Sequence, residues 1–130
     1  MKIALVQMDV AHGQPVENKK HVKEMLERAL SEKPDVIVLP EMWNTGYALD
    51  ELDGLADKEG LNSQELLSHF ARKHAVAIIG GSVAIEKDGK FYNTTYVYNK
   101  SGDLINTYSK VHLFGLMAED QYMSAGSSES

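Results

Sequence analysis

A glutamate follows an apolar run near the start of this 130-residue chain. Four consecutive aliphatic residues, 36–39, lead into Pro40 and then Glu41. An uninterrupted apolar run predicts a strand that is buried on both faces. A proline, which has no N–H to donate, marks the end of such a strand. Open α/β sheets place their chemistry at the carboxyl ends of their strands, so Glu41 is either a catalytic carboxylate at that edge or a loop carboxylate facing water.

A lysine late in the chain has the second setting that suggests chemistry. Lys110 follows Tyr108 and Ser109 at the end of a predicted strand and precedes an apolar stretch. A lysine among apolar residues either extends its ammonium to water or is held by a carboxylate. Glu41 is a natural partner, because a carboxylate beside an ammonium can act as a general base while the ammonium stabilises negative charge. Glu119 is a second carboxylate near Lys110 in the sequence. It is either a further member of this group or a residue exposed at the surface.

The elements that must position these residues predict an α/β fold. A strand over 2–8, a helix that begins near Pro15 and the strand that ends at residue 39 form a strand–helix–strand unit with parallel strands. One face of that helix is apolar at helical spacing, through Val22, Met25, Leu26, Ala29 and Leu30.

The second part of the chain predicts an antiparallel meander. A long loop over 44–60 leads to a helix, where Asn62 and Glu65 resemble a capping box. Strands follow over 76–79, 83–86, 91–98 and 104–108, with a two-residue turn at Asp88-Gly89.

Composition limits the classes of partner. A net charge of −6 and a pI near 5.3 argue against nucleic acid, because phosphate backbones need a basic stripe. No apolar run approaches the roughly 20 residues of a membrane span, and the N-terminus is typical of a strand rather than a signal peptide. The five histidines stand singly, which argues against a metal site. Cysteine is absent, which excludes disulfides within the chain and fits a reducing cytoplasm.

Two segments, LPEMWNTGY and YSKVHLF, resemble motifs of the nitrilase (carbon–nitrogen hydrolase) superfamily, in its ω-amidase-like branch. The resemblance covers nearly the whole chain. It implies the N-terminal half of an α-β-β-α sandwich, a mixed sheet with helices on one face. The partial domain would span 1–126, with a flexible tail over 127–130. The family uses a Glu-Lys-Cys triad, so the resemblance implies that Glu41 is the general base, Lys110 the oxyanion stabiliser and Glu119 a residue that positions the base or the substrate amide.

The same resemblance implies the reaction. A cysteine thiolate attacks a small aliphatic or 2-oxo-acid ω-amide, and no organic or metal cofactor is required. This chain has no cysteine, so we expect a truncated, cytoplasmic hydrolase that is inactive alone. The resemblance also implies a dimer, because members of the family commonly form dimers. Trp43 and Tyr47, in the loop after Glu41, either line the acyl pocket or serve packing. The alternative function is a non-catalytic interaction module, or a homo-oligomer that pairs through exposed sheet edges.

Overall fold

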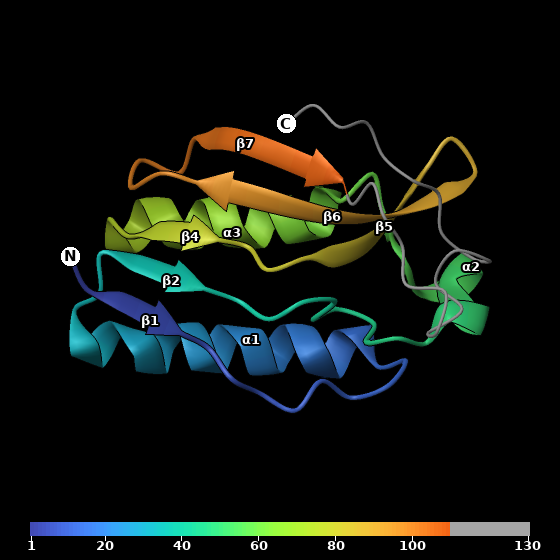
Figure 1. The fold of residues 1–130 in the computed structure, drawn as a ribbon, viewed down its shortest axis with the longest axis horizontal. Coiled ribbons are helices and arrows are strands. Elements are labelled where there is room, and N and C mark those ends of the chain that lie inside the picture. Colours follow the sequence, from blue (N-terminus) through green and yellow to red (C-terminus); the bar gives the residue numbers. More distant parts are fainter. Residues whose placement is uncertain (110–130) are drawn as a thin grey trace.

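A mixed sheet with the two long helices on one of its faces forms the framework of the chain (Figure 1). The computed structural model describes residues 1–109, so the predicted tail at 127–130 lies outside the described residues. Within the described range the sheet has seven strands. Their order is β1 (Ile3–Leu5), β2 (Val36–Val38), β4 (Ala77–Ile79), β6 (Lys90–Tyr98), β5 (Val83–Lys87) and β3 (Asp57–Lys58), and β7 (Leu104–Ser109) also pairs with β6.

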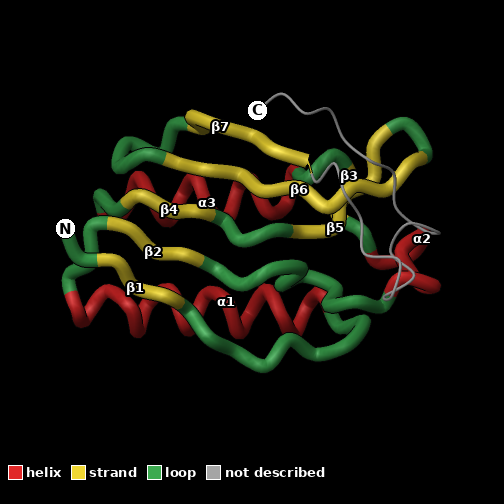
Figure 2. Tube along the Cα trace, viewed as in Figure 1, coloured by secondary structure: helices red, strands yellow, loops and turns green. Residues whose placement is uncertain are grey.

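Parallel pairs stand towards both ends of this sheet, and the antiparallel pairs of β6 lie between them. Figure 2 shows the strands side by side. β1, β2 and β4 run parallel, and α1 (Pro15–Ala29) and α3 (Leu61–His74) lie in the crossovers between them. β6 runs antiparallel to β4, β5 and β7. Asp88 and Gly89, both at positive φ, form the turn between β5 and β6. The predicted parallel start and antiparallel meander are therefore both confirmed.

The first helix follows its sequence pattern. Pro15 stands at its start, where a missing N–H leaves no hydrogen bond unmade. Val22 and Leu26 are fully buried, and the other predicted apolar positions pack against the same core. A 3-10 turn over Leu30–Glu32 ends the helical segment, with Lys33 in the left-handed region. The helix thus forms because its apolar stripe matches the sheet beneath it.

The start of α3 corrects the prediction of an Asn62–Glu65 capping box. The helix begins at Leu61, and the Asp57 carboxylate accepts the N–H of Asn62 at 3.2 Å and the N–H of Ser63 at 2.7 Å. The Ser63 hydroxyl also donates to this carboxylate, at 2.7 Å. β3 holds Asp57 beside the start of α3. The aspartate therefore caps the helix although it stands four residues before Leu61 and not at the N-cap position itself.

One face of the sheet, the covered face, is buried under the helices. Ile37, Ile78 and Tyr98 lie in register there with exposed fractions of 0%, 0% and 2%. Residues from both helices join them in a single core: Val22, Leu26, Leu67, Phe70 and Ala71. This continuous apolar layer fixes β2, and with it the position where the chain leaves the sheet towards Glu41.

The opposite face, the open face, is apolar as well. Register places on it Ile3, Leu5, Val36, Val38, Ala77, Ile79 and Val97. Leu5 is 70% exposed and Ile3 is 55% exposed. The prediction that both faces of the central strand are buried is therefore wrong for this chain, since Val36 and Val38 are only half-buried. No second layer of described residues covers them.

The stretch over 44–60 is more ordered than the predicted loop. It contains a 3-10 turn (Leu49–Glu51), α2 (Leu52–Leu55) and β3, which pairs parallel to β5. Elements of two to four residues are too short to show a hydrophobic period, so no sequence pattern predicts them. Nowhere in residues 1–109 is there a helix with both the length and the apolarity needed to cross a membrane.

Tyr96 on the covered face predicts how stability depends on alkaline pH. Burial, followed by the negative charge of Asp57, raises the pKa of Tyr96 to about 12 from its ordinary 10.0. The unfolded chain loses this proton first, so the free energy of unfolding falls as pH rises from 10.0 towards about 12. Burial raises the pKa of Tyr98 as well, which adds to the slope.

We expect Tyr96→Phe, which keeps the ring, to flatten this pH dependence. Urea denaturation midpoints measured across the interval test the expectation. An unchanged slope in Tyr96→Phe would show that the hydroxyl does not carry the effect.

Candidate active site

Glu41 lies just past the carboxyl end of β2, as predicted. It borders a hollow of about 440 Å³ (the Glu41 hollow). The wall is partly apolar and partly polar, and consists of Val38, Leu39, Glu41, Ile79, Gly81, Ser82, Asn93, Thr95 and Tyr108. Val38 and Ile79 belong to the open face, so the carboxylate stands at the end of the parallel strands and beside the uncovered side of the sheet.

A break between β4 and β5 shapes this hollow. Ile79 pairs with Val97 and Val83 pairs with Thr94, so three residues, 80–82, stand opposite two, 95 and 96. This is a bulge in one continuous edge against β6, and bulges of this kind re-aim side chains next to functional sites. The Thr95 hydroxyl donates to the Gly81 carbonyl at 2.6 Å and holds the bulge against β6.

Ser82 in this bulge binds the backbone on both sides of Glu41 (the Ser82 clamp). Its N–H donates to the Pro40 carbonyl at 3.3 Å, and its Oγ accepts the Met42 N–H at 2.9 Å. The Ser82 carbonyl accepts the Trp43 N–H at 3.1 Å. The carboxylate therefore projects from a backbone fixed at the residue before it and at the two residues after it.

The clamp needs a very close approach of two chain segments. An added Cβ at Gly81 would lie 2.0 Å from the Pro40 carbonyl oxygen, and Gly81 has φ +62°. Met42 also lies in the left-handed region, at φ 52°. A non-glycine residue there is uncommon, and such backbone strain persists only where the surroundings over-determine it.

The residues after Glu41 are anchored individually. The buried Trp43 donates its indole N–H to the Gly80 carbonyl at 2.9 Å. The Asn44 side chain exchanges two hydrogen bonds of 2.9 Å with the backbone of Ala84, as a neighbouring strand would. The Tyr47 hydroxyl donates to Oε1 of Glu41. The loop thus presents an exposed carboxylate from a backbone that these hydrogen bonds hold in place.

The two predicted pocket residues lie in different surroundings. Tyr47 is half-buried and contacts Glu41 directly. Trp43 is 1% exposed, belongs to the main core and does not line the Glu41 hollow. These contacts do not test its predicted role in an acyl pocket, which stays a prediction. They do show that Trp43 packs in the core, which was the alternative role.

Two of the predicted catalytic residues, Lys110 and Glu119, lie outside the described residues. Their convergence with Glu41 therefore stays a prediction. Within residues 1–109 no group of three or more His, Asp or Glu side chains is placed to hold a metal ion.

Three polar wall residues were missed at the level of sequence: Ser82, Asn93 and Thr95. A signal for Ser82 existed, since Gly80 and Gly81 before it indicate close approach of another backbone. No local sequence pattern distinguishes Asn93 and Thr95 from the other residues of β6. Asn93 pairs with Ala84 of β5, and Thr95 bonds the Gly81 carbonyl in the bulge, so tertiary contacts bring both to the Glu41 hollow.

Comparison with known proteins shows the family of the chain. The family model described as carbon-nitrogen hydrolase matches residues 2–130. The chain belongs to the carbon–nitrogen hydrolase family. It is 46% identical over 127 residues to the 2-oxoglutaramate amidase of Bacillus subtilis (strain 168), covering 98% of this chain and 49% of that protein. Omega-amidase NIT3 of Saccharomyces cerevisiae is 34% identical over 122 residues, covering 88% of this chain and 42% of that enzyme.

A solved structure shows the same fold. The crystal structure of Saccharomyces cerevisiae Nit3, described as a member of branch 10 of the nitrilase superfamily, superposes with a TM-score of 0.84 at 30% identity. The match covers 98% of this chain and 49% of the Nit3 chain. The chain therefore spans about half the length of the relatives it matches. The predicted family, the similarity to omega-amidases and the partial fold are confirmed.

Gly81→Ala tests the close approach that supports Glu41. We expect it to lower the free energy of unfolding by about 1–3 kcal/mol or more, because the new Cβ meets backbone and the residue keeps positive φ. Gly54→Ala is the matched control, since nothing lies within 4 Å of its added Cβ. It should be neutral or slightly stabilising. Urea denaturation followed by far-UV circular dichroism measures both, and equal stability of the two variants would contradict the packing described here.

Proposed function

We propose that this chain supplies the general-base part of an amidase site. Glu41 carries the proposal: it is held at the carboxyl end of a central strand by the Ser82 clamp, and Tyr47 hydrogen-bonds its carboxylate. The proposed substrates are small aliphatic or 2-oxo-acid ω-amides. The names of the relatives, 2-oxoglutaramate amidase and omega-amidase, support this class. So does a hollow whose apolar wall suits a short acyl chain and whose amide and hydroxyl groups suit polar ends.

The proposed roles follow from the chemistry of amide hydrolysis. Glu41 takes the proton from a thiol, the thiolate attacks the amide carbon, and the Lys110 ammonium stabilises the oxyanion that forms. Glu41 returns the proton to the leaving nitrogen as the C–N bond breaks. Water, activated by the same carboxylate, then hydrolyses the thioester. Glu119 positions the base or the substrate amide.

The thiol must come from outside this sequence, because the chain contains no cysteine. The proposal therefore includes that the chain by itself does not release ammonia from amides. It places the chemistry in the cytoplasm, where a thiol nucleophile stays reduced.

A chimera tests the assignment of the base. This chain would be joined to the part of the Bacillus subtilis 2-oxoglutaramate amidase that it does not cover, and ammonia release from 2-oxoglutaramate measured. We expect activity in the chimera and none in the chain alone. Glu41→Gln in the chimera should lower kcat/KM by roughly 10²–10⁴, the usual contribution of a general base.

Glu51→Gln is the matched control, because Glu51 is an exposed carboxylate in the same loop region. It should leave kcat/KM unchanged. A folded chimera whose activity survives Glu41→Gln would refute the general-base role, and turnover by the chain alone would demand another nucleophile.

A second role, association through the open face, has its own observation. Large apolar side chains of β1 are more than half exposed, at 55% for Ile3 and 70% for Leu5, and such faces mark interaction surfaces. We propose that copies of this chain associate through the open face into a homo-oligomer, which would bury these side chains.

Sedimentation velocity tests the association. The chain should sediment as an oligomer, and Leu5→Glu should shift it to the monomer because a charge cannot be buried there without a partner. Val16→Glu, at an 81% exposed position on α1, should leave the oligomer intact. A monomer at all concentrations would show that this face does not join copies of the chain.

A further inference from the structure

Tyr47 is the side chain that meets the carboxylate of Glu41. Its hydroxyl donates to Oε1 of Glu41 from six residues further along the chain. One predicted role of Tyr47, a wall of the acyl pocket, would bring it against a substrate. Tyr47 is not among the residues that line the Glu41 hollow, however. The hydroxyl therefore reaches the carboxylate from outside this hollow.

A turn over residues 42–46 brings the tyrosine back beside Glu41. The Gly46 N–H donates to the Met42 carbonyl at 2.8 Å, which closes a five-residue turn. Both of its ends have positive φ, 52° at Met42 and 61° at Gly46. A chain that bends this tightly returns Tyr47 towards the residue just before the turn, which is Glu41.

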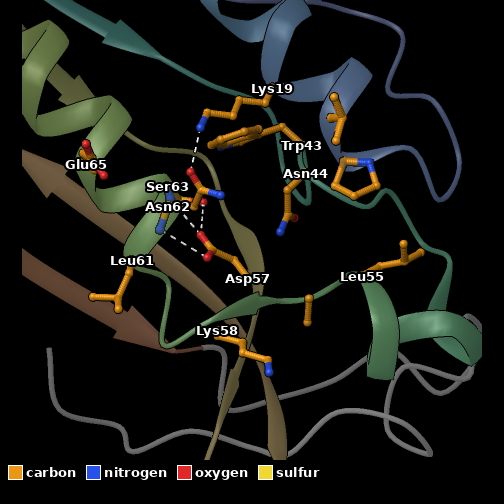
Figure 3. A pocket seen from close by; sticks show the side chains of 13 residues that line it. Lys19, Trp43, Asn44, Leu55, Asp57, Lys58, Leu61, Asn62, Ser63 and Glu65 are labelled. Carbon is orange, nitrogen blue, oxygen red and sulfur yellow. Dashed lines mark hydrogen bonds between the residues drawn. The ribbon is translucent and has the colours of Figure 1, made fainter.

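The middle of this turn is tied to two other elements. The Asn44 carbonyl accepts a hydrogen bond of 2.9 Å from the side-chain amide of Asn18 on α1. The Asn44 side chain pairs with the Ala84 backbone on β5. Figure 3 shows Trp43 and Asn44 beside the start of α1. None of these bonds involves the Glu41 side chain, so they hold the turn whatever the position of the carboxylate.

The ring of Tyr47 has its own support. It packs against the small cluster of Met42, Leu52 and Ala84, each of which is at most 2% exposed. A tyrosine side chain has only two torsions, so a packed ring leaves its hydroxyl at a nearly fixed position. The donor that meets Glu41 is therefore in place before any substrate binds.

The Glu41 side chain requires a partner of this kind. It is exposed, and an exposed glutamate can adopt several rotamers. The Ser82 clamp fixes its backbone but not its side-chain torsions. A general base must lie within hydrogen-bond reach of the proton that it takes. A donor fixed beside one carboxylate oxygen favours one orientation of the carboxylate over the others.

We propose that Tyr47 is a positioning residue for the general base. It holds the Glu41 carboxylate in the orientation that exchanges a proton at the Glu41 hollow, and it does not itself contact the substrate. An ionised carboxylate accepts about four hydrogen bonds, so the bond from Tyr47 leaves the base able to take a proton. The inference rests on the proposed general-base role of Glu41.

Kinetics of the chimera described above separate positioning from substrate contact. Tyr47→Phe keeps the ring and removes only the hydroxyl. We expect kcat and kcat/KM for 2-oxoglutaramate to fall together by roughly 10- to 10²-fold, with KM unchanged. A rise in KM at constant kcat would assign Tyr47 to the substrate and overturn the proposal, as would full activity of Tyr47→Phe.

Tyr92→Phe is the matched control for this measurement. Tyr92 is also a half-buried tyrosine that packs against a core cluster, and it does not line the Glu41 hollow. It should leave kcat and KM unchanged. An equal loss in Tyr92→Phe would show that the effect of Tyr47→Phe is not specific to the contact with Glu41, and would overturn the proposal.

The combination with Glu41→Gln tests whether Tyr47 acts through the carboxylate. Tyr47→Phe should cost nothing further once Glu41 is replaced, because the two residues then no longer act as a pair. A further loss of tenfold or more, of the size expected for Tyr47→Phe by itself, would overturn the proposal. Full activity of Glu41→Gln refutes the general-base role itself. Loss of activity in Glu41→Gln with none in Tyr47→Phe refutes only the positioning.

Nuclear magnetic resonance of the chain itself tests the contact without catalysis. Three-bond couplings about the Cα–Cβ bond of Glu41 report whether its side chain keeps one rotamer. We expect the couplings of a single rotamer in the chain and averaged couplings in Tyr47→Phe. Averaged couplings already in the unchanged chain, or a single rotamer in both, would show that Tyr47 does not hold the carboxylate.

Discussion

The support of Glu41 depends on the close contact of the Gly81 backbone with the carbonyl of Pro40. No side chain fits between them, and this lack of space allows Ser82 to bind the chain before and after Glu41. Leu39 donates its N–H to the Ile79 carbonyl at 3.0 Å, next to the contact between Pro40 and Gly81. The pairing of β2 with β4 therefore continues up to this contact and brings the two segments together. The position of the Glu41 backbone thus depends on two segments that leave neighbouring strands, β2 and β4.

How far the sequence predicts this arrangement depends on the range of the interactions involved. The apolar run before Pro40 and the stripe of α1 are local patterns, and both the strand end at Glu41 and the helix were confirmed from them. Asp57 as the cap of α3 and Asn93 as a wall residue depend on strand pairing, which leaves no local signature. The sequence therefore predicted where Glu41 stands and named its neighbour Tyr47, but not the wall residues that strand pairing brings beside it.

The two faces of the sheet explain why one sequence prediction failed where its neighbours succeeded. Val36 and Ile37 are equally apolar, yet only Ile37 is fully buried, because both long helices pack on its side. Apolar residues in a strand indicate that a face of the sheet packs against another layer, but they do not indicate which segment forms that layer. In a chain that spans about half the length of its relatives, that distinction becomes visible.

The bulge at 80–82 also sets the phase of β5. Side chains along a strand alternate, so a deletion of one residue in the bulge would turn β5 over. Val83 and Ile85 now fill the main core, and Ala84 packs against Met42 and Leu52 in a separate, smaller cluster. After such a deletion two bulky side chains would be forced into the space of one methyl group. The length of this segment is therefore as strictly determined as its composition.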